Sequence, residues 1–376
     1  MNYHRNSSNK TVWDKIKNIG KHKKQKKSRS DVFEQWFIKA VSVVFCCFLA
    51  FILFHVLTNL DSFKETRKAK YVTLTQAELG TKEVYGTQKD SAGNVSEVNG
   101  LVPVSCYGDS FTNTADDSTA SYPGILSVLA QRTVYNVAVN NDTIYEMAAR
   151  EGGRPAVVSP FIIPTNKAST EVLVSGQNEK AINFDMSKNG GLNPCKIKGI
   201  EGLLSDINGT FYFTRVDSGE EELVLTPTTI QTRAMELRSG DICVFFLGDD
   251  DIYETPEKAV EVYKDMVKYL GDNQKYLVVG PVKGEIAELD AANKALATAF
   301  GDKFLDLRSY LIKDADTMLK IKLSEDDRVL ANNNIVPYVY FTSDGKHFSA
   351  QGADAAGKAT FDKLTSLGYF EDAIEK

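Results

Sequence analysis

Histidine and cysteine are scarce in this chain of 376 residues, and their positions exclude several kinds of site. Three of the four histidines, His4, His22 and His55, precede residue 60, so histidine-dependent chemistry further along must use His347. The five cysteines are odd in number and irregularly spaced, a pattern that does not indicate a disulfide framework. No CxxC or CxxH spacing predicts a zinc site, and glycine-rich phosphate loops are absent. We therefore expect neither a metal nor a cofactor.

One long uncharged run, residues 40–59, lies near the N-terminus and contains neither glycine nor proline. About 20 apolar residues are enough for a helix to cross a bilayer. Trp36 and Lys39 stand at the N-terminal edge of this run, where such residues anchor at the membrane interface. We therefore predict a transmembrane helix over residues 36–59. A cleaved signal peptide and a buried core helix are the alternatives, but no clear small-residue cleavage pattern follows the run.

Charge is distributed unevenly along the chain. Residues 1–39 contain eleven Lys and Arg against three Asp and Glu, a net charge of +8. The whole chain carries −6, so residues 40–376 carry −14. The basic flank predicts a single-pass protein of the cell membrane, with residues 1–35 as a cytoplasmic tail and the remainder outside. The acidic outer part argues against nucleic acid as a partner, because phosphate backbones select basic surfaces.

Beyond the predicted membrane helix, the chain changes character twice. Residues 60–100 are rich in Lys, Glu, Thr, Gly and Ser and are interpreted as a stalk or linker. From residue 101, apolar runs typical of buried strands alternate with helical patterns. The predicted strands cover residues 101–107, 134–139, 241–247, 275–281 and 303–307, and the predicted helices cover residues 122–132, 143–150, 256–270, 285–300 and 349–367. This alternation predicts an α/β fold, a parallel sheet flanked by helices, in two parts at residues 101–153 and 241–376.

Residues 154–240 interrupt this alternation. They show little helical periodicity, and turn signals such as Asn189-Gly190-Gly191 and Asn208-Gly209 separate short alternating runs. We therefore predict a β-rich insertion. It either shapes access to an active site or serves as a structural lobe or an oligomer contact.

Two polar motifs stand far apart in the sequence but in contexts suited to one catalytic site. Gly108-Asp109-Ser110 follows a predicted strand, and Asp344-Gly345-Lys346-His347 precedes a predicted helix. A serine at a strand end is a candidate nucleophile, since its hydroxyl needs a neighbouring base for activation. His347 is the candidate base and later acid, and Asp344 is the candidate residue that orients its imidazole. Asp109 is expected to brace the turn around Ser110.

This pairing of motifs resembles the SGNH (GDSL-type) hydrolase superfamily, whose first block is Gly-Asp-Ser and whose last block is Asp-x-x-His. The resemblance covers about residues 101–151 and 241–367 and excludes the insertion. It implies a flavodoxin-like sheet and ester hydrolysis by Ser110, His347 and Asp344. It also implies an oxyanion hole formed by the amide of the serine, a glycine amide from a second block and an asparagine side chain from a third.

The chain departs from the family pattern in the second block, which corresponds to residues 136–143, and in the third block, which corresponds to residues 248–251. Asn141 stands where the glycine is expected, and its backbone amide can still donate because Asn tolerates a positive φ. Asp250, after Gly248-Asp249, stands where the asparagine is expected. An ionised aspartate accepts hydrogen bonds and does not donate them, so it disfavours an oxyanion unless burial keeps it protonated. Capture of calcium by Asp249-Asp250-Asp251 and a simple solvated loop are the other interpretations.

Three functions are compatible with these motifs. The first is a membrane-tethered extracytoplasmic serine esterase or deacylase that acts on an acylated small molecule or an O-acylated cell-surface glycan. The second is a catalytically weak or inactive module that binds a glycan or a protein, which is suggested by Asp250 in place of the oxyanion-hole asparagine. The third is transfer of the acyl group from Ser110 to a sugar hydroxyl, because water and sugar compete for the same intermediate.

Overall fold

The computed structural model describes residues 84–85, 88–89, 95–96, 101–113, 121–176, 182–249, 254–271 and 275–371. All of these belong to one compact unit, residues 69–376, of the two into which the chain divides. The predicted cytoplasmic tail and transmembrane helix, residues 1–59, lie outside the described residues. Within the described part, no helix is both long and apolar enough to cross a bilayer.

A six-stranded sheet forms the centre of this unit, in the order β1-β5-β4-β15-β16-β17. Its strands are β1 (Val84–Tyr85), β4 (Val104–Gly108), β5 (Val134–Asn136), β15 (Ile242–Phe246), β16 (Tyr276–Val279) and β17 (Phe304–Leu305). All neighbouring strands are parallel except β1, which pairs antiparallel with β5. The order reverses between β4 and β15, and such a switch point opens a crevice at the carboxyl ends of the strands. The predicted parallel sheet with flanking helices is confirmed.

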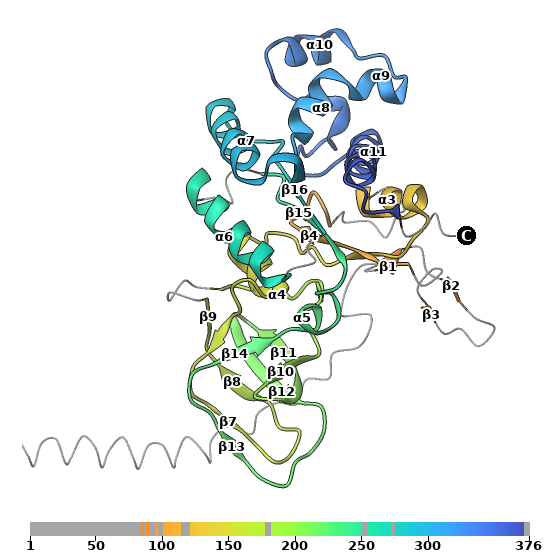
Figure 1. The fold of residues 1–376 in the computed structure, drawn as a ribbon. Coiled ribbons are helices and arrows are strands. Elements are labelled where there is room, and N and C mark those ends of the chain that lie inside the picture. Colours follow the sequence, from red (N-terminus) through yellow and green to blue (C-terminus); the bar gives the residue numbers. More distant parts are fainter. Residues whose placement is uncertain are drawn as a thin grey trace, which may run out of the picture. The chain divides into compact units, whose positions relative to one another are not determined.

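Helices cover both faces of the sheet (Figure 1). One face packs against α3 (Tyr122–Ala130) and α11 (Ala350–Ser366), and the other against α4 (Ile144–Glu151), α6 (Pro256–Tyr269) and α7 (Ile286–Phe300). Side chains alternate accordingly along the central strands. On β15, Val244 and Phe246 enter the first core, whereas Cys243 and Phe245 enter the second. The strands are therefore apolar throughout, as expected for a sheet buried on both sides.

Side-chain caps set the starts of the flanking helices. Ser121, Thr255 and Ser349 precede α3, α6 and α11, and each side chain accepts a hydrogen bond from a backbone amide of the first turn. Thr143 starts α4 with a capping box, because Glu146 accepts from the Thr143 amide at 3.1 Å while Thr143 Oγ1 accepts from the Tyr145 amide, in the first turn, at 3.2 Å. These caps satisfy amides that otherwise lack partners. The Thr143 cap also fixes the point at which the chain leaves the second block.

The insertion is a separate antiparallel lobe whose seven-stranded sheet has the order β8-β12-β11-β10-β14-β6-β9. Its strands are β6 (Val157–Val158), β8 (Thr170–Val172), β9 (Val174–Ser175), β10 (Cys195–Ile197), β11 (Ile200–Ile207), β12 (Thr210–Arg215) and β14 (Thr228–Gln231), and β7 (Ile162–Ile163) pairs with β13 (Leu223–Val224). The Asn208-Gly209 signal marks a two-residue hairpin between β11 and β12, with φ of 56° and 79°. The lobe has its own apolar core.

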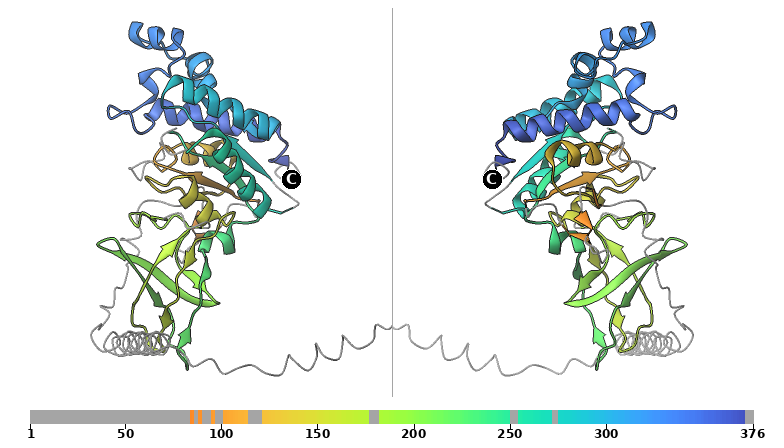
Figure 2. Two further views of the ribbon diagram at one scale, coloured as in Figure 1. Left: turned by 90° about the vertical axis from the view of Figure 1, so that its left-hand side faces the viewer. Right: turned by 90° about the vertical axis from the view of Figure 1, so that its right-hand side faces the viewer.

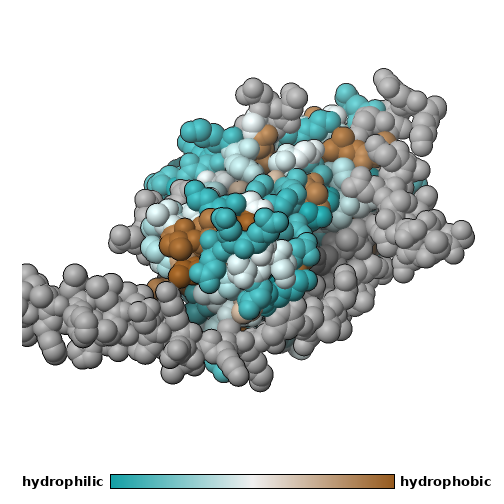
Figure 3. Space-filling view, turned by 90° about the horizontal axis from the view of Figure 1, so that it is seen from below, coloured by the Kyte–Doolittle hydropathy of each residue, from teal (hydrophilic) through white to brown (hydrophobic). Residues whose placement is uncertain are grey.

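The C-terminal helices, drawn in blue, and the lobe lie at opposite ends of the unit, with the central sheet between them (Figure 2). Seen from the end of the lobe, the surface is largely hydrophilic, and its hydrophobic patches are small and separate (Figure 3). Leu173 and Val224 are among the exposed apolar side chains of the lobe. Scattered exposed apolar residues of this kind are ordinary for a protein surface.

The structure differs from the sequence-based expectations in three places. Residues 84–85 belong to the predicted stalk but form the edge strand β1, and a short pair, β2 (Gln88–Lys89) with β3 (Val95–Ser96), follows it. The short helix α5 (Arg233–Leu237) ends the lobe. Three further helices, α8 (Leu307–Lys313), α9 (Ala315–Leu319) and α10 (Glu325–Asn332), fill the segment before the histidine loop. These elements are only two to eight residues long, too short for a clear periodic signal.

Candidate active site

Ser110 lies two residues beyond the last residue of β4, at the edge where the central strands end. The turn that follows is closed by hydrogen bonds from the Thr112 and Asn113 amides to the Asp109 carbonyl, at 3.1 and 2.8 Å. Gly108 permits this exit, since a Cβ atom there would lie 2.0 Å from the carbonyl oxygen of Phe246 on β15. Ser110 itself is partly exposed, whereas Asp109 beside it is buried. The fold thus presents a serine hydroxyl at the switch point of the sheet.

The histidine loop reaches this serine from the other end of the chain. The Ser110 hydroxyl donates to the carbonyl oxygen of Lys346 across a long contact of 3.4 Å, over a sequence separation of 236 residues. His347 follows directly, and its Nδ1 lies 3.0 Å from Asp344 Oδ2. Within the described residues, no hydrogen bond joins the Ser110 hydroxyl to the His347 ring. The structure therefore brings all three predicted triad residues into one place, with the serine hydroxyl directed at the backbone beside the histidine.

Asp344 is held in its ionised form by several donors. Thr342 Oγ1 donates to Asp344 Oδ1 at 2.5 Å, the Lys346 amide donates to the same oxygen at 2.8 Å, and His347 faces the other oxygen. These contacts, the Thr342 hydroxyl first, hold the pKa of the Asp344 carboxyl well below its usual range. Gly345 adopts a φ of 63°, which the tight turn between Asp344 and His347 requires. A carboxylate so placed can orient the imidazole and leave Nε2 to act as the base.

The second block runs alongside the Ser110 turn. The Val139 amide donates to the Gly108 carbonyl at 3.1 Å, and the chain then turns through Asn140 and Asn141. Asn141 has a φ of 60°, a left-handed conformation that Asn adopts more readily than most residues. Asn therefore tolerates the backbone conformation at the position where the resemblance would imply a glycine. In the described part of the chain, neither the Ser110 amide nor the Asn141 amide has a hydrogen-bond acceptor.

Asp109 ties the third block to the first. Its two oxygens accept from the Phe111 and Gly248 amides, each at 2.9 Å, so one buried carboxylate joins the ends of β4 and β15. Burial raises the pKa of Asp109 to about 6, and the nearby charge of Asp249 adds to the rise. Gly248 is as confined as Gly108, because a Cβ atom there would lie 2.3 Å from the Phe111 ring. Asp109, Gly108 and Gly248 thus shape the site without facing the reaction.

The remaining part of the third block is only partly described. Asp249 forms a parallel bridge with Lys283, and the Gly248 carbonyl accepts from the Val282 and Lys283 amides at 3.0 Å. Asp250, the predicted third oxyanion residue, and Asp251 lie outside the described residues. Over the described ranges, no three His, Cys, Asp or Glu side chains are grouped to hold a metal ion.

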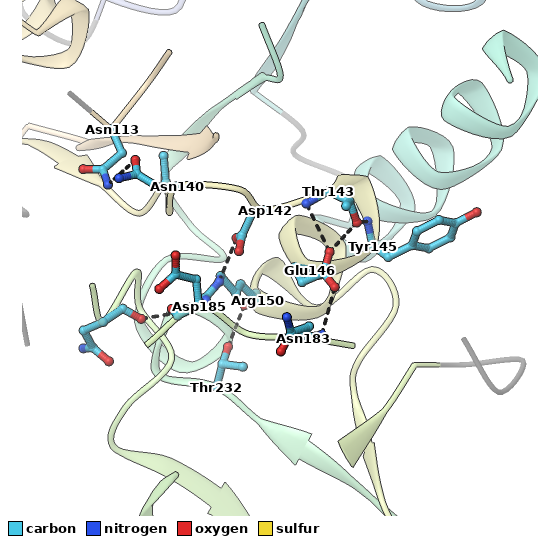
Figure 4. Close-up of polar contacts among 12 residues, drawn as sticks. Asn113, Asn140, Asp142, Thr143, Tyr145, Glu146, Arg150, Asn183, Asp185 and Thr232 are labelled. Atoms are coloured by element: carbon cyan, nitrogen blue, oxygen red, sulfur yellow. Dashed lines mark hydrogen bonds and ion pairs between the residues drawn. The ribbon is translucent and has the colours of Figure 1, made fainter. Parts of the chain in front are cut away.

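A polar groove of about 530 Å³ begins at Asn141 and runs between the α/β core and the lobe. Its core side is lined by Asn141, Thr143 and Glu146, and its lobe side by residues 183–187 and Asp206. The two sides touch, because Asn141 Nδ2 donates to Asp185 at 3.4 Å. The Asn183 amide also donates to Glu146 at 3.0 Å (Figure 4). The groove therefore carries amide, hydroxyl and carboxylate groups beside one of the two predicted oxyanion donors.

A second pocket, of about 320 Å³ and mainly apolar, lies beside the histidine loop. It is lined by residues 282–286, Leu289, Arg308, residues 334–336, Tyr338, Phe341 and Gly345. Gly345 belongs to the turn that positions His347, so this apolar pocket borders the histidine loop.

A buried ion pair anchors the second block to the lobe. Arg150 and Asp142 are both almost fully buried, and Arg150 Nε donates to Asp142 Oδ2 at 2.9 Å. The same guanidinium donates to the carbonyl oxygens of Asn189 and Asp185, at 3.0 and 3.3 Å. Its carbon lies 4.8 Å from the centre of the Phe184 ring. One side chain of α4 thus fixes both the Asn141 loop and the lobe segment that lines the groove.

No family model, curated protein or solved structure matches the chain.

Sequence reasoning missed three polar residues of this region, namely Asn113, Asn140 and Lys188. Asn113 Nδ2 donates to Asn140 Oδ1 at 3.0 Å, and Lys188 Nζ donates to Asn113 Oδ1 at 3.1 Å. Asn113 and Asn140 stand in the motif segments and could have been noticed as polar residues after a strand end. Lys188 carries no such signal, since lysine is usually exposed and its burial here follows from how the lobe docks.

Proposed function

We propose that this protein is a serine esterase or deacylase of the SGNH type, tethered outside the membrane by residues 36–59. The observation that carries the proposal is the meeting of Ser110 with the Asp344–His347 loop at the switch point of a parallel sheet. The strand order of β5, β4, β15, β16 and β17 is the flavodoxin-like order, which agrees with the architecture that the resemblance implies.

The chemistry follows from the roles of the three residues. His347 Nε2 takes the proton of the Ser110 hydroxyl as its oxygen attacks the carbonyl carbon of an ester. The hydroxyl must first leave the Lys346 carbonyl, and a contact of 3.4 Å is long enough to be given up at little cost. His347 then returns the proton to the departing alcohol, and an acyl-serine remains. Water, deprotonated by the same ring, releases the acid and restores Ser110.

Two backbone amides are the proposed donors to the oxyanion. The amides of Ser110 and Asn141 lie at adjacent strand ends and have no acceptors in the described part, as a preorganised hole requires. Such a donor contributes roughly 3–4 kcal/mol of transition-state stabilisation. The proposed site therefore has two donors independent of the side chain of Asp250.

The polar groove supports a hydroxyl-rich substrate. It begins at Asn141 and presents amide and carboxylate groups from both the core and the lobe. Sugar hydroxyls both donate and accept hydrogen bonds, and such surfaces pair with them. An O-acylated cell-surface glycan therefore fits the site better than a wholly apolar ester, with the lobe forming one side of the glycan site.

The proposal is tested by labelling the full-length chain with a serine-reactive fluorophosphonate and by hydrolysis of p-nitrophenyl acetate. We expect labelling and turnover in the natural chain and neither in Ser110→Ala. Ser343→Ala is a matched control, because Ser343 is an exposed serine in the same loop as His347 and has no role in the triad. Equal labelling of the natural chain and Ser110→Ala would refute the proposal.

A further inference from the structure

Lys188 is a lysine of the lobe that is buried to 1 % exposure. Burial of an ammonium group is costly unless it is hydrogen-bonded, so such a lysine normally has a defined partner. Here Lys188 Nζ donates to Asn113 Oδ1 at 3.1 Å. Asn113 closes the turn that contains Ser110, because its backbone amide donates a hydrogen bond to the Asp109 carbonyl. A residue of the insertion therefore reaches the turn of the proposed nucleophile.

The lysine determines which way the Asn113 side-chain amide faces. An ammonium group donates hydrogen bonds and never accepts them, so it must meet the oxygen of the amide and not its nitrogen. The nitrogen, Asn113 Nδ2, then faces Asn140 Oδ1 at 3.0 Å, and this pair is seen in Figure 4. Asn140 immediately precedes Asn141. Lys188, Asn113 and Asn140 thus form one directed chain of hydrogen bonds from the lobe to the second block.

This chain joins the two segments that carry the proposed oxyanion donors. Asn113 is three residues from Ser110, and Asn140 is adjacent to Asn141. The two donor amides must keep a fixed separation to bind one oxygen, within about 0.5 Å of the productive geometry. A displacement of about 1 Å at a catalytic group costs on the order of 100-fold in rate. A side-chain link between the two segments is therefore a means of holding the hole in shape.

We infer that Lys188 is a positioning residue for the proposed esterase, which sets the separation of the Ser110 and Asn141 amides through Asn113 and Asn140. The inference rests on the proposed function, and it gives the lobe a role beyond lining the groove. The positive charge of Lys188 also has the sign that favours a developing oxyanion. Lys188 itself touches neither substrate nor the reacting atoms in this scheme.

Three variants of the full-length chain test the inference with p-nitrophenyl acetate. Lys188→Met removes the donor, and we expect kcat to fall about 100-fold with KM changed less than about twofold. Asn113→Asp keeps a partner for Lys188 but loses the donor to Asn140, so kcat should fall while thermal stability is retained. Lys167→Met makes the same change at an exposed lobe lysine and should leave kcat unchanged. If kcat in Asn113→Asp or Lys188→Met stays within about twofold of the natural chain, the inference is wrong.

Hydrogen–deuterium exchange separates this inference from the proposed function. In Lys188→Met we expect faster exchange in both segments, residues 108–113 and residues 139–143, and no change in Lys167→Met. A natural chain without esterase activity would refute the proposed function, but coupled exchange would still show that Lys188 positions both segments. Unchanged exchange in either segment would overturn the positioning role even in an active enzyme. Asn113→Asp provides the same measurement if Lys188→Met fails to fold.

Discussion

The buried pair between Arg150 and Asp142 makes a strong prediction about stability. Arg150 Nε donates to Asp142 at 2.9 Å, and both side chains have 1 % exposure or less. The guanidinium also satisfies the carbonyl oxygens of Asn189 and Asp185 and stacks against Phe184. Arg150→Met retains much of the aliphatic stem but leaves a buried carboxylate and two carbonyl groups without this donor. Breaking such a pair from one side costs about 3–5 kcal/mol of unfolding free energy.

Part of this cost comes from the charge of Asp142, which burial already disfavours, since burial raises the pKa of this carboxyl to about 7 even beside Arg150. The double variant Arg150→Met/Asp142→Asn removes that charge, so we expect it to recover about 2 kcal/mol relative to Arg150→Met alone. Arg233→Met is the matched control, because Arg233 pairs with Glu236 near the surface and should cost less than about 1 kcal/mol.

Urea unfolding of the full-length chain in detergent, followed by circular dichroism, measures these differences. Tryptophan fluorescence is unsuitable, since the two tryptophans, Trp13 and Trp36, both precede residue 60. A cost below about 1 kcal/mol for Arg150→Met would refute the reasoning, and so would a double variant no more stable than the single one.

Two further predictions concern the two aspartates of the site. Asp344→Asn should lower kcat for p-nitrophenyl acetate by about 10⁴-fold, because an amide at this position no longer selects the reactive tautomer of His347. A loss of kcat below tenfold would contradict the assigned role, and so would an equal loss in the exposed control Asp354→Asn. The pKa of Asp109 is about 6 in the fold against an ordinary 3.8, so the folded chain binds a proton between these values that the unfolded chain has released. Stability from this group therefore falls as pH rises from about 4 to 6, by up to about 3 kcal/mol. Asp109→Asn should remove this part of the pH dependence of the unfolding free energy, measured by urea unfolding at pH 4 to 7, whereas the exposed control Asp302→Asn should not. If the unfolding free energies of the natural chain and Asp109→Asn change in parallel with pH, Asp109 is not the source.

Sequence pattern alone was enough to predict the α/β core and its elements. The apolar runs of β4, β15 and β16 are local, and a strand buried on both faces needs such a run whatever its neighbours are. The same holds for the helices that follow them, whose starts are marked by capping residues such as Ser121 and Thr143. The signal at Asn208-Gly209 likewise predicted a turn, which depends only on adjacent residues, and the structure has the hairpin of β11 and β12 there.

The candidate triad was predictable for a different reason. His347 is the only histidine beyond residue 59, and the Gly-Asp-Ser motif follows a strand, so residue type and scarcity narrowed the choice. The facing of Asp344 and His347 is also local, since only three residues separate them. What the pattern did not contain was the contact between Ser110 and the Lys346 carbonyl, which depends on how the chain returns after more than two hundred residues.

The sequence by itself determined the longer strands and helices of the α/β core and which side chains are candidates for a nucleophile, a base and an orienting carboxylate, because periodicity and residue type are local properties. Only the tertiary structure decided that Lys188 of the lobe is buried against Asn113, that Arg150 fixes the Asn141 loop, and that Asp109 joins two strand ends. A lysine, an arginine and an aspartate are usually solvated, and their burial is set by the partners that distant segments bring to them.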